Sequence, residues 1–232
     1  MTTLLLLRHG STAANAAGVL AGWTPGVGLE ETGRQQSAAV AERLRPLPLT
    51  AIVSSPLDRC LQTAAAVAEG RDGLTVVTDD RLGECHYGDW TGRTLKELAR
   101  QPMWKVVQQH PSAAVFPGDG GEGLADTQHR AVSAVRDWNV RLGPDAVWVA
   151  CSHGDVIKAI LADALGLHLD QFQRIVVEPA SISVISYTDT RPFVVRVNDT
   201  GGGIEALMPP KKRGRRKRSS DAVVGGGTGG PA

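Results

Sequence analysis

Leu4-Leu5-Leu6-Leu7-Arg8-His9-Gly10 is the stretch that decides the fold of this chain. Its four leucines form a short unbroken apolar run, which is typical of a strand covered on both faces. Two later stretches repeat the pattern: Ala51-Ile52-Val53 precedes Ser54-Ser55-Pro56, and residues 146–150 precede Ser152-His153-Gly154. Each stretch predicts a buried strand that ends in polar residues and a turn.

Helical patterns alternate with these strands. The predicted helices cover residues 32–44, 62–69, 94–100, 104–110, 124–142 and 155–165, and further strands cover 74–78, 182–187 and 193–197, with Pro192 in the turn before the last. Alternating helices and wholly apolar strands predict an α/β fold, a three-layer α/β/α sandwich with a mostly parallel central sheet. In such sheets, ligands bind beyond the carboxyl ends of the strands.

The length and the charge distribution divide the chain into two parts. Its 232 residues suit one domain, which we place at residues 1–200. Residues 201–232 are rich in Gly, Pro and basic residues and have little to bury, so we predict a disordered tail. Residues 208–232 carry seven Lys or Arg and one Asp, and because the whole chain has a net charge of +1, residues 1–207 carry −5. The folded part must therefore concentrate positive charge locally to bind an anion.

Cysteine usage and the amino-terminal sequence bear on location. Cys60, Cys85 and Cys151 are odd in number and widely spaced, which argues against a disulfide framework and favours a reducing, cytoplasmic location. The first apolar run has four residues and no basic leader, so it does not resemble a signal peptide. No stretch approaches the roughly 20 apolar residues that a membrane span needs, so we expect no membrane association.

Two histidines follow predicted strands and are themselves followed by glycine. His9 lies after the first strand and His153 after the strand at residues 146–150, so both imidazoles are expected at the same edge of the sheet. A neutral imidazole can attack phosphorus and divide a difficult hydrolysis into two easier steps. We take His9 as the candidate nucleophile and His153 as a donor to the transferred phosphoryl group.

Four more side chains complete the candidate site. Arg8 and Arg59 suit the phosphoryl oxygens because a guanidinium matches their geometry and stays charged. Asn15, six residues after His9, would add an amide N–H. Glu84 would donate a proton to the leaving oxygen and later activate water.

These motifs, in this order, resemble the histidine phosphatase superfamily, whose fold is phosphoglycerate-mutase-like. The matching residues are Arg8-His9-Gly10 with Thr12 and Asn15, residues 54–64 including Arg59, Glu84 with Tyr87, Gly88, Trp90 and Gly92 downstream, and Ser152-His153-Gly154. The resemblance implies that His9 is the phosphorylated histidine, that Arg59 binds phosphate and that Glu84 is the proton donor. It also implies a three-layer α/β fold, no metal and no cofactor, and the wider sequence is similar to an actinobacterial branch.

The superfamily contains both phosphatases and mutases, and details of this chain favour a phosphatase. Mutases of this kind grip a substrate carboxylate with an arginine directly after the acid and with an arginine pair in a following insertion. Here Cys85 follows Glu84, and residues 93–110 contain no adjacent arginine pair. We therefore expect hydrolysis of a small-molecule phosphomonoester, with a phosphoglycerate mutase or related phosphomutase as the alternative. A homo-oligomer is compatible with the sequence.

The basic run at residues 211–218 supports a second class of function. Seven positive charges in eight positions can bind nucleic acid or another anionic surface, and the chain would then be an inactive phosphate-binding or interaction protein. No aromatic residue in the run can stack on a base, and the complete set of candidate catalytic residues argues for an enzyme. We therefore expect no nucleic-acid partner for the folded part.

Overall fold

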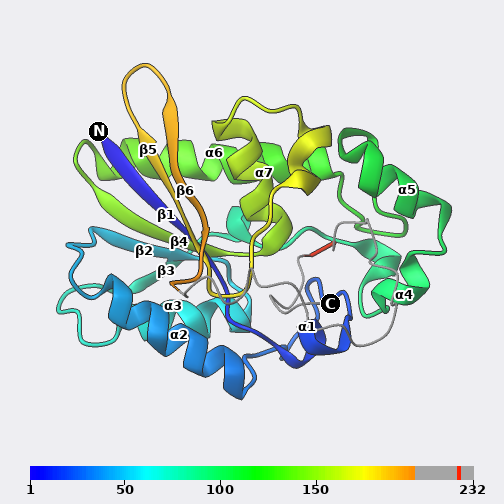
Figure 1. The fold of residues 1–232 in the computed structure, drawn as a ribbon, viewed down its shortest axis with the longest axis horizontal. Coiled ribbons are helices and arrows are strands. Elements are labelled where there is room, and N and C mark those ends of the chain that lie inside the picture. The colour runs from blue at the N-terminus through cyan, green and yellow to red at the C-terminus, as the bar shows by residue number, and fades with distance from the viewer. Residues whose placement is uncertain (202–223, 226–232) are drawn as a thin grey trace, which may run out of the picture.

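A six-stranded sheet forms the centre of the molecule in the computed structural model, which describes residues 1–201, 224 and 225 (Figure 1). Its strands are β1 (Thr2–Arg8), β2 (Ala51–Ser54), β3 (Val76–Thr78), β4 (Val147–Ser152), β5 (Ile182–Tyr187) and β6 (Pro192–Asp199). They lie in the order β3-β2-β4-β1-β5-β6. Strands β3, β2, β4 and β1 pair in parallel with one another, whereas β5 is antiparallel to both β1 and β6. The predicted sheet is therefore confirmed.

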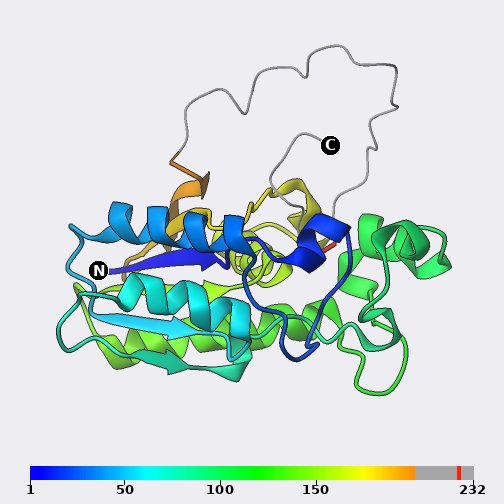
Figure 2. The ribbon, with the colours of Figure 1, turned by 90° about the horizontal axis from the view of Figure 1, so that it is seen from below.

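Two helical layers cover the sheet. The layer of α2 (Glu31–Leu44) and α3 (Asp58–Ala68) packs on one face, and the layer of α6 (Leu124–Leu142) and α7 (Gly154–Ala164) packs on the other. Figure 2 looks at the molecule from the side of α2 and α3. The two faces and their helices make a three-layer α/β/α sandwich, as the sequence predicts.

The leucine run of β1 serves both layers. Leu4 and Leu6 belong to the core with α6 and α7, while Leu5 and Leu7 belong to the core with α2 and α3. This alternation follows from the two-residue period of a strand. All four side chains are at most 4% exposed, and each contributes roughly 1.5–3 kcal/mol by leaving water.

Several predicted boundaries shift in the structure. α6 and β5 begin and end where the sequence predicts. α3 begins at Asp58 rather than residue 62, because Leu57 keeps an extended backbone and the helix starts directly after it. Pro192 opens β6 and pairs with Tyr187 rather than lying in the turn, a position that an edge strand tolerates. α1 (Ala13–Ala17) was not predicted, since its five residues bury none of their side chains.

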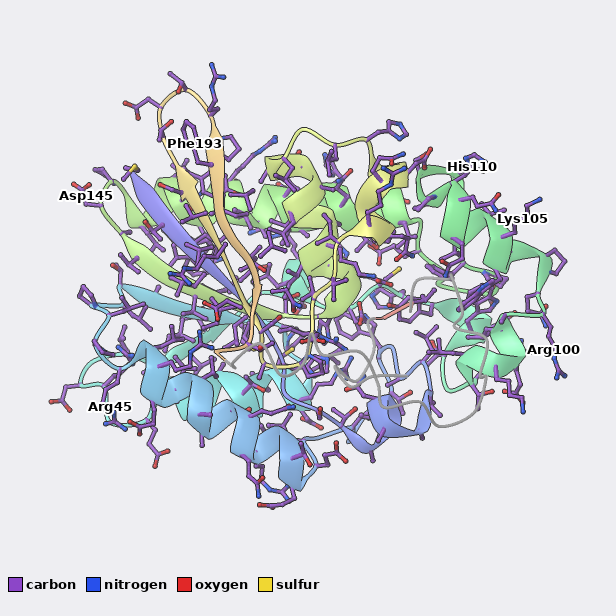
Figure 3. All side chains as sticks on the ribbon, viewed as in Figure 1. Arg45, Arg100, Lys105, His110, Asp145 and Phe193 are labelled. Carbon is purple, nitrogen blue, oxygen red and sulfur yellow. The ribbon has the colours of Figure 1, made fainter. Side chains whose placement is uncertain are left out.

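Short helices extend the molecule beyond the carboxyl ends of the parallel strands. α4 (Leu95–Leu98) and α5 (Pro102–Gln109) lie together at one end, and α1 lies between them and the sheet (Figure 1). Figure 3 shows Arg100, Lys105 and His110 pointing outward from this end of the molecule. The described part of the chain also contains the 3-10 turns η1 (Asp80–Leu82), η2 (Gly88–Trp90), η3 (Pro111–Ala113) and η4 (Leu169–Arg174).

The predicted tail falls almost wholly outside the described residues. Disorder was predicted for residues 201–232, and only Gly201, Val224 and Gly225 of this segment are described. Val224 is 1% exposed and belongs to the core under α6 and α7. None of the helices in the described ranges is long and apolar enough to cross a membrane.

Candidate active site

The candidate residues gather at the carboxyl ends of β1, β2 and β4. Arg8, the last residue of β1, lies in register with Ser152, the last residue of β4. The backbone N–H of His9 donates to the carbonyl of Ser152 at 3.0 Å, and that of Ser55 donates to Cys151 at 2.9 Å. Parallel pairing therefore places the polar residues after all three strands side by side.

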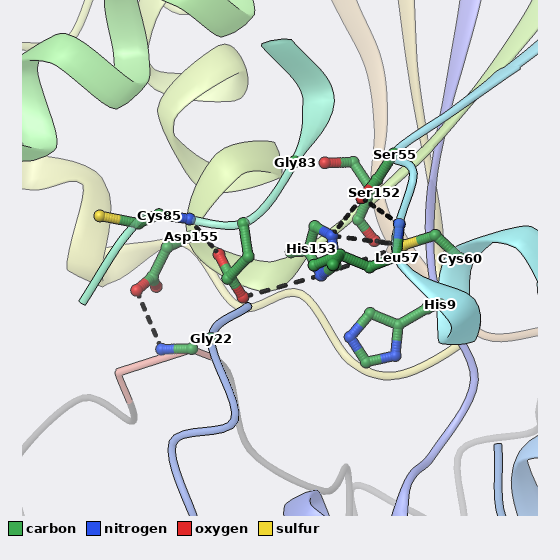
Figure 4. A network of polar contacts seen from close by, with 12 residues as sticks. His9, Gly22, Ser55, Leu57, Cys60, Gly83, Cys85, Ser152, His153 and Asp155 are labelled. Carbon is green, nitrogen blue, oxygen red and sulfur yellow. Dashed lines mark hydrogen bonds and ion pairs between the residues drawn. The ribbon is translucent and has the colours of Figure 1, made fainter. Parts of the chain in front are cut away.

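The two histidines face one another across this edge. Their ring centroids are 5.2 Å apart with the planes at 60°, and Figure 4 shows both rings beside the Ser55 turn. His9 Nδ1 lies 2.7 Å from the carbonyl oxygen of Gly10. Because a carbonyl only accepts, Nδ1 carries the proton, and the lone pair of His9 is on Nε2.

Burial and neighbouring charges keep the His9 ring neutral. The pKa of His9 is held well below 6.5, first by burial and then by the guanidiniums of Arg59 and Arg8. A neutral ring is the nucleophilic form, so the same charges that attract a phosphate prevent the loss of the lone pair to a proton.

His153 is held by a serine that the sequence did not single out. Its Nε2 lies 2.8 Å from Ser55 Oγ and 3.4 Å from Cys60 Sγ. Its Nδ1 lies 3.8 Å from Glu84 Oε2, so the second histidine adjoins the candidate proton donor. Burial, followed by the charge of Arg59, lowers the pKa of His153 well below 6.5.

The two arginines are buried and oriented by backbone carbonyls. Arg8 donates from Nη1 to Val177 at 2.7 Å and from Nη2 to Gly225 at 3.2 Å. Burial lowers the pKa of Arg8 to about 10, which still leaves it charged at neutral pH. Arg59 lies in the first turn of α3 and donates from Nη2 to Gly22 at 2.8 Å.

Glu84 is a buried acid whose pKa is raised into the neutral range. Its Oε1 accepts the N–H of Cys85 at 3.1 Å. Burial, and then the negative charge of Asp155, raises the pKa of Glu84 to about 7. A carboxyl group with that pKa can be an acid in one step and a base in the next.

A scaffold that the sequence did not reveal holds the backbone of Glu84. Trp23 Nε1 donates to the Glu84 carbonyl at 2.6 Å, and Arg130 Nη2 donates to it at 3.0 Å. Arg130 also donates to the carbonyls of Arg81 and Gly83 and pairs with Glu122. No sequence signal marks Arg130, because a charged residue in an amphipathic helix is usually exposed.

Asn15 is positioned by helix capping. Thr12 and Asn15 form a capping box at the start of α1, in which Asn15 Oδ1 accepts the backbone N–H of Thr12 at 3.2 Å, and the same oxygen accepts from Thr12 Oγ1 at 2.9 Å. With the amide oxygen engaged, the Nδ2 group is the part of Asn15 that can donate to a ligand.

Close backbone contact fixes the loop that carries His9. A Cβ on Gly10 would lie 2.5 Å from the Gly33 carbonyl oxygen, and one on Gly33 would lie 2.0 Å from that of Ser11. Helix α2 therefore packs directly on the loop, an approach that only glycine allows.

These groups enclose a cavity of about 40 Å³. Of the six candidate residues, the four that line it are His9, Asn15, Arg59 and Glu84. Val224 and Gly225 complete its wall, and Gly225 N–H donates to Asp155 Oδ2 at 2.9 Å. Arg8 and His153 stand behind this lining. Among the described residues, no group of three His, Cys, Asp or Glu side chains could hold a metal ion.

The arrangement can perform phosphoryl transfer. It offers a free imidazole nitrogen, two guanidiniums and a carboxyl group that is protonated near neutral pH, all within one buried cluster. Charge stabilisation and positioning of this kind are the main requirements of phosphoryl transfer.

Comparison with known proteins gives the same picture. The model of the "Histidine phosphatase superfamily (branch 1)" matches residues 4–200. A glucosyl-3-phosphoglycerate phosphatase of Mycolicibacterium vanbaalenii is 36% identical over 176 residues, 73% of this chain and 76% of that protein. A probable phosphoglycerate mutase GpmB of Cronobacter sakazakii is 29% identical over 215 residues, 90% of this chain and 97% of that protein. The solved structure of Bacillus stearothermophilus YhfR superposes with a TM-score of 0.78 at 31% identity, covering 86% of this chain and 98% of the other.

Proposed function

Because this chain belongs to the histidine phosphatase superfamily, we propose that it is a phosphomonoester hydrolase acting through a phosphohistidine at His9. Its substrate is a small phosphorylated metabolite. The observation that carries this proposal is the hydrogen bond from His9 Nδ1 to the Gly10 carbonyl, which leaves Nε2 as a nucleophile on the cavity wall.

In the first half-reaction, His9 Nε2 attacks phosphorus and the bond from phosphorus to the ester oxygen breaks. Glu84 gives its proton to the departing oxygen, and Arg8, Arg59 and His153 stabilise the phosphoryl oxygens. Asn15 adds an N–H from the cavity wall. The buried guanidiniums are oriented before substrate arrives, so little reorganisation is needed as charge develops.

In the second half-reaction, water attacks the phosphohistidine. Glu84, now ionised, takes a proton from the water, the bond from phosphorus to nitrogen breaks, and inorganic phosphate leaves. His9 keeps its Nδ1 proton throughout, so the ring returns to its starting state.

Among the described residues, no second set of cations of the kind that a mutase would use lines the cavity. Cys85, directly after the acid, is fully buried in the core. None of the basic residues that follow lines the cavity; these are Arg93, Lys96, Arg100 and Lys105. Arg59, which the mechanism uses for the phosphoryl group, is the one arginine that lines the cavity in the described part of the chain, so none is left there for the carboxylate of a phosphoglycerate. This supports water as the phosphoryl acceptor.

The deciding experiment measures phosphate release from a panel of phosphomonoesters with a chelator present. Wild type is compared with His9→Ala and with His129→Ala, which removes an exposed imidazole on α6. We expect release from wild type and His129→Ala and none from His9→Ala, with a phosphoryl adduct on His9 in rapidly quenched enzyme. Conversion of 3-phosphoglycerate to its 2-isomer with little free phosphate would establish a mutase instead.

A further inference from the structure

Asp155 is a buried acid that the mechanism above does not use. It lies in the first turn of α7, two residues after His153, and is 1% exposed. It does not line the cavity, and the mechanism above assigns it no contact with the phosphoryl group. A carboxylate this deeply buried needs partners, and the partners of Asp155 connect it to the catalytic groups.

Both oxygens of Asp155 are engaged. Oδ2 accepts the phenolic O–H of Tyr87 at 3.0 Å, and Tyr87 itself lines the cavity beside Glu84. Oδ1 lies 3.3 Å from Nζ of Lys158, whose side chain is 4% exposed. Lys158 Nζ also donates to Gln173 Oε1 at 2.9 Å. These contacts fix the direction of the Asp155 carboxylate.

Asp155 and Glu84 belong to one group of buried charges. Asp155 lies near Cys85, the residue after Glu84, in Figure 4. Burial raises the pKa of Glu84 most, and the negative charge of Asp155 raises it further, against the opposing charges of Arg59 and Arg8. The groups facing Glu84 are Arg8 from β1, Arg59 from α3, His153 at the start of α7, and Asp155 from α7 itself. Asp155 is the anion in this set, and an anion favours retention of the proton on a neighbouring carboxyl group.

We propose that Asp155 is a positioning residue for proton transfer. Its buried carboxylate, fixed by Tyr87 and Lys158, favours the protonated form of Glu84, so that Glu84 can donate its proton to the leaving oxygen in the first half-reaction. This inference rests on the proposed role of Glu84 as proton donor. Tyr87 and Lys158 act through Asp155, and neither exchanges a proton with substrate. The charge of Lys158 limits the effect of Asp155, so that Glu84 can still ionise for the second half-reaction.

The decisive test replaces Asp155 by Asn, which keeps the shape and removes the charge. The titration midpoint of Glu84 is read by carbon NMR of the full chain labelled at the glutamate carboxyl groups, with Glu84→Gln assigning the resonance. We expect Asp155→Asn to lower that midpoint by about one pH unit, as the loss of a nearby like charge does. The matched control is Asp163→Asn, on the same helix with its carboxylate toward Arg136 at the surface, and it should leave the midpoint unchanged.

A second variant changes the charge in the opposite sense. Lys158→Gln removes the cation beside Asp155 and should raise the Glu84 midpoint. Shifts of the Glu84 midpoint in opposite directions in the two variants distinguish an electrostatic effect from damage to the fold. Damage that admits water would shift the midpoint in the same direction in both variants. An unchanged or raised midpoint in Asp155→Asn, or a lowered midpoint in Lys158→Gln, overturns the proposal.

Turnover supplies a separate readout. For an alkyl phosphate, a poor leaving group, the alkaline limb of kcat against pH should shift in Asp155→Asn by the same amount as the NMR midpoint. For an aryl phosphate with a good leaving group, kcat should change less than twofold. A loss equal for both substrates at every pH indicates a merely structural role. If Glu84→Gln keeps full activity while Asp155→Asn still shifts the Glu84 midpoint, Glu84 is not the proton donor. The electrostatic effect of Asp155 on Glu84 would then still be supported.

Discussion

At the scale of single residues, the site depends on which groups hold protons. Glu84→Gln keeps the size of the side chain and removes the acid, so kcat for an alkyl phosphate should fall by roughly 100- to 10,000-fold. The loss should be much smaller for p-nitrophenyl phosphate, whose leaving oxygen needs no proton. Steady-state rates for both substrates check this, with the exposed Glu69→Gln as the control. Equal losses for the two substrates would remove Glu84 from proton transfer.

The protonation states of His9, His153 and Glu84 also make the free energy of unfolding depend on pH. His9 and His153 have pKa values held well below 6.5 in the fold, so below pH 6.5 the unfolded chain takes up two protons that the folded chain does not. Glu84 has a pKa of about 7 in the fold against 4.5 unfolded, so between these values the folded chain holds one extra proton. Taken together, the three groups make the unfolded chain bind one proton more than the folded chain. The free energy of unfolding therefore falls by about 1.4 kcal/mol per pH unit on going from about pH 6 to 5.

Glu84→Gln removes the offsetting proton and should double this slope, to about 2.7 kcal/mol per pH unit. His9→Gln should reduce the slope toward zero. Urea unfolding of wild type and both variants between pH 5 and pH 7 measures the difference, and other acidic groups cancel in the comparison. A slope in Glu84→Gln equal to that of wild type would mean that Glu84 is not protonated in the fold at these pH values.

At the scale of secondary-structure elements, the packing of α2 on the loop after β1 is the tightest constraint on the nucleophile. Gly33→Ala would place a Cβ 2.0 Å from the Ser11 carbonyl oxygen, so the helix or the loop must move. We expect a loss of about 1–3 kcal/mol in unfolding free energy and at least a tenfold loss of kcat/KM. Gln35→Ala, at an exposed position of the same helix, should change neither. Full activity in Gly33→Ala would show that the loop can move without displacing His9.

Elements also show how far the sequence could predict this protein. The apolar runs before Arg8, Ser54 and Ser152 were sufficient to place three strand ends, because a parallel sheet aligns its carboxyl ends. The predicted site residues are therefore close together in space, and their chemical roles stay predictions. The hydrogen bonds of Arg130 and Trp23 to the backbone of Glu84 could not be predicted, since the first joins α6 to a loop across 46 positions and the second joins two loops across 61 positions. No local pattern encodes such distant partners.

At the scale of the whole molecule, the described part of the tail meets the active site. Val224 and Gly225 line the cavity, and the carbonyl of Gly225 takes a hydrogen bond from Arg8. A chain ending at Gly201 should therefore bind substrate more readily, with KM lowered several-fold. It should also lose about 1.5–3 kcal/mol of stability because Val224 no longer buries its side chain.

Kinetics and urea unfolding of the truncated chain test this together. The control keeps full length and replaces the basic residues of 211–218 by Ser, which removes charge and retains Val224 and Gly225. That control should keep the KM of the full-length chain. A truncated chain with unchanged KM would mean that these two residues do not compete with substrate.

The small cavity beside His9 has an evolutionary consequence. A phosphohistidine reacts with whichever acceptor reaches it first, so the side chains that wall the cavity decide whether water or a hydroxyl group of a metabolite is that acceptor. Hydrolysis and transfer then differ by the residues that line the cavity rather than by the residues that react. A lineage could move from one activity to the other by changing the walls formed by Val19, Leu20 and Leu95, with every reacting residue left in place.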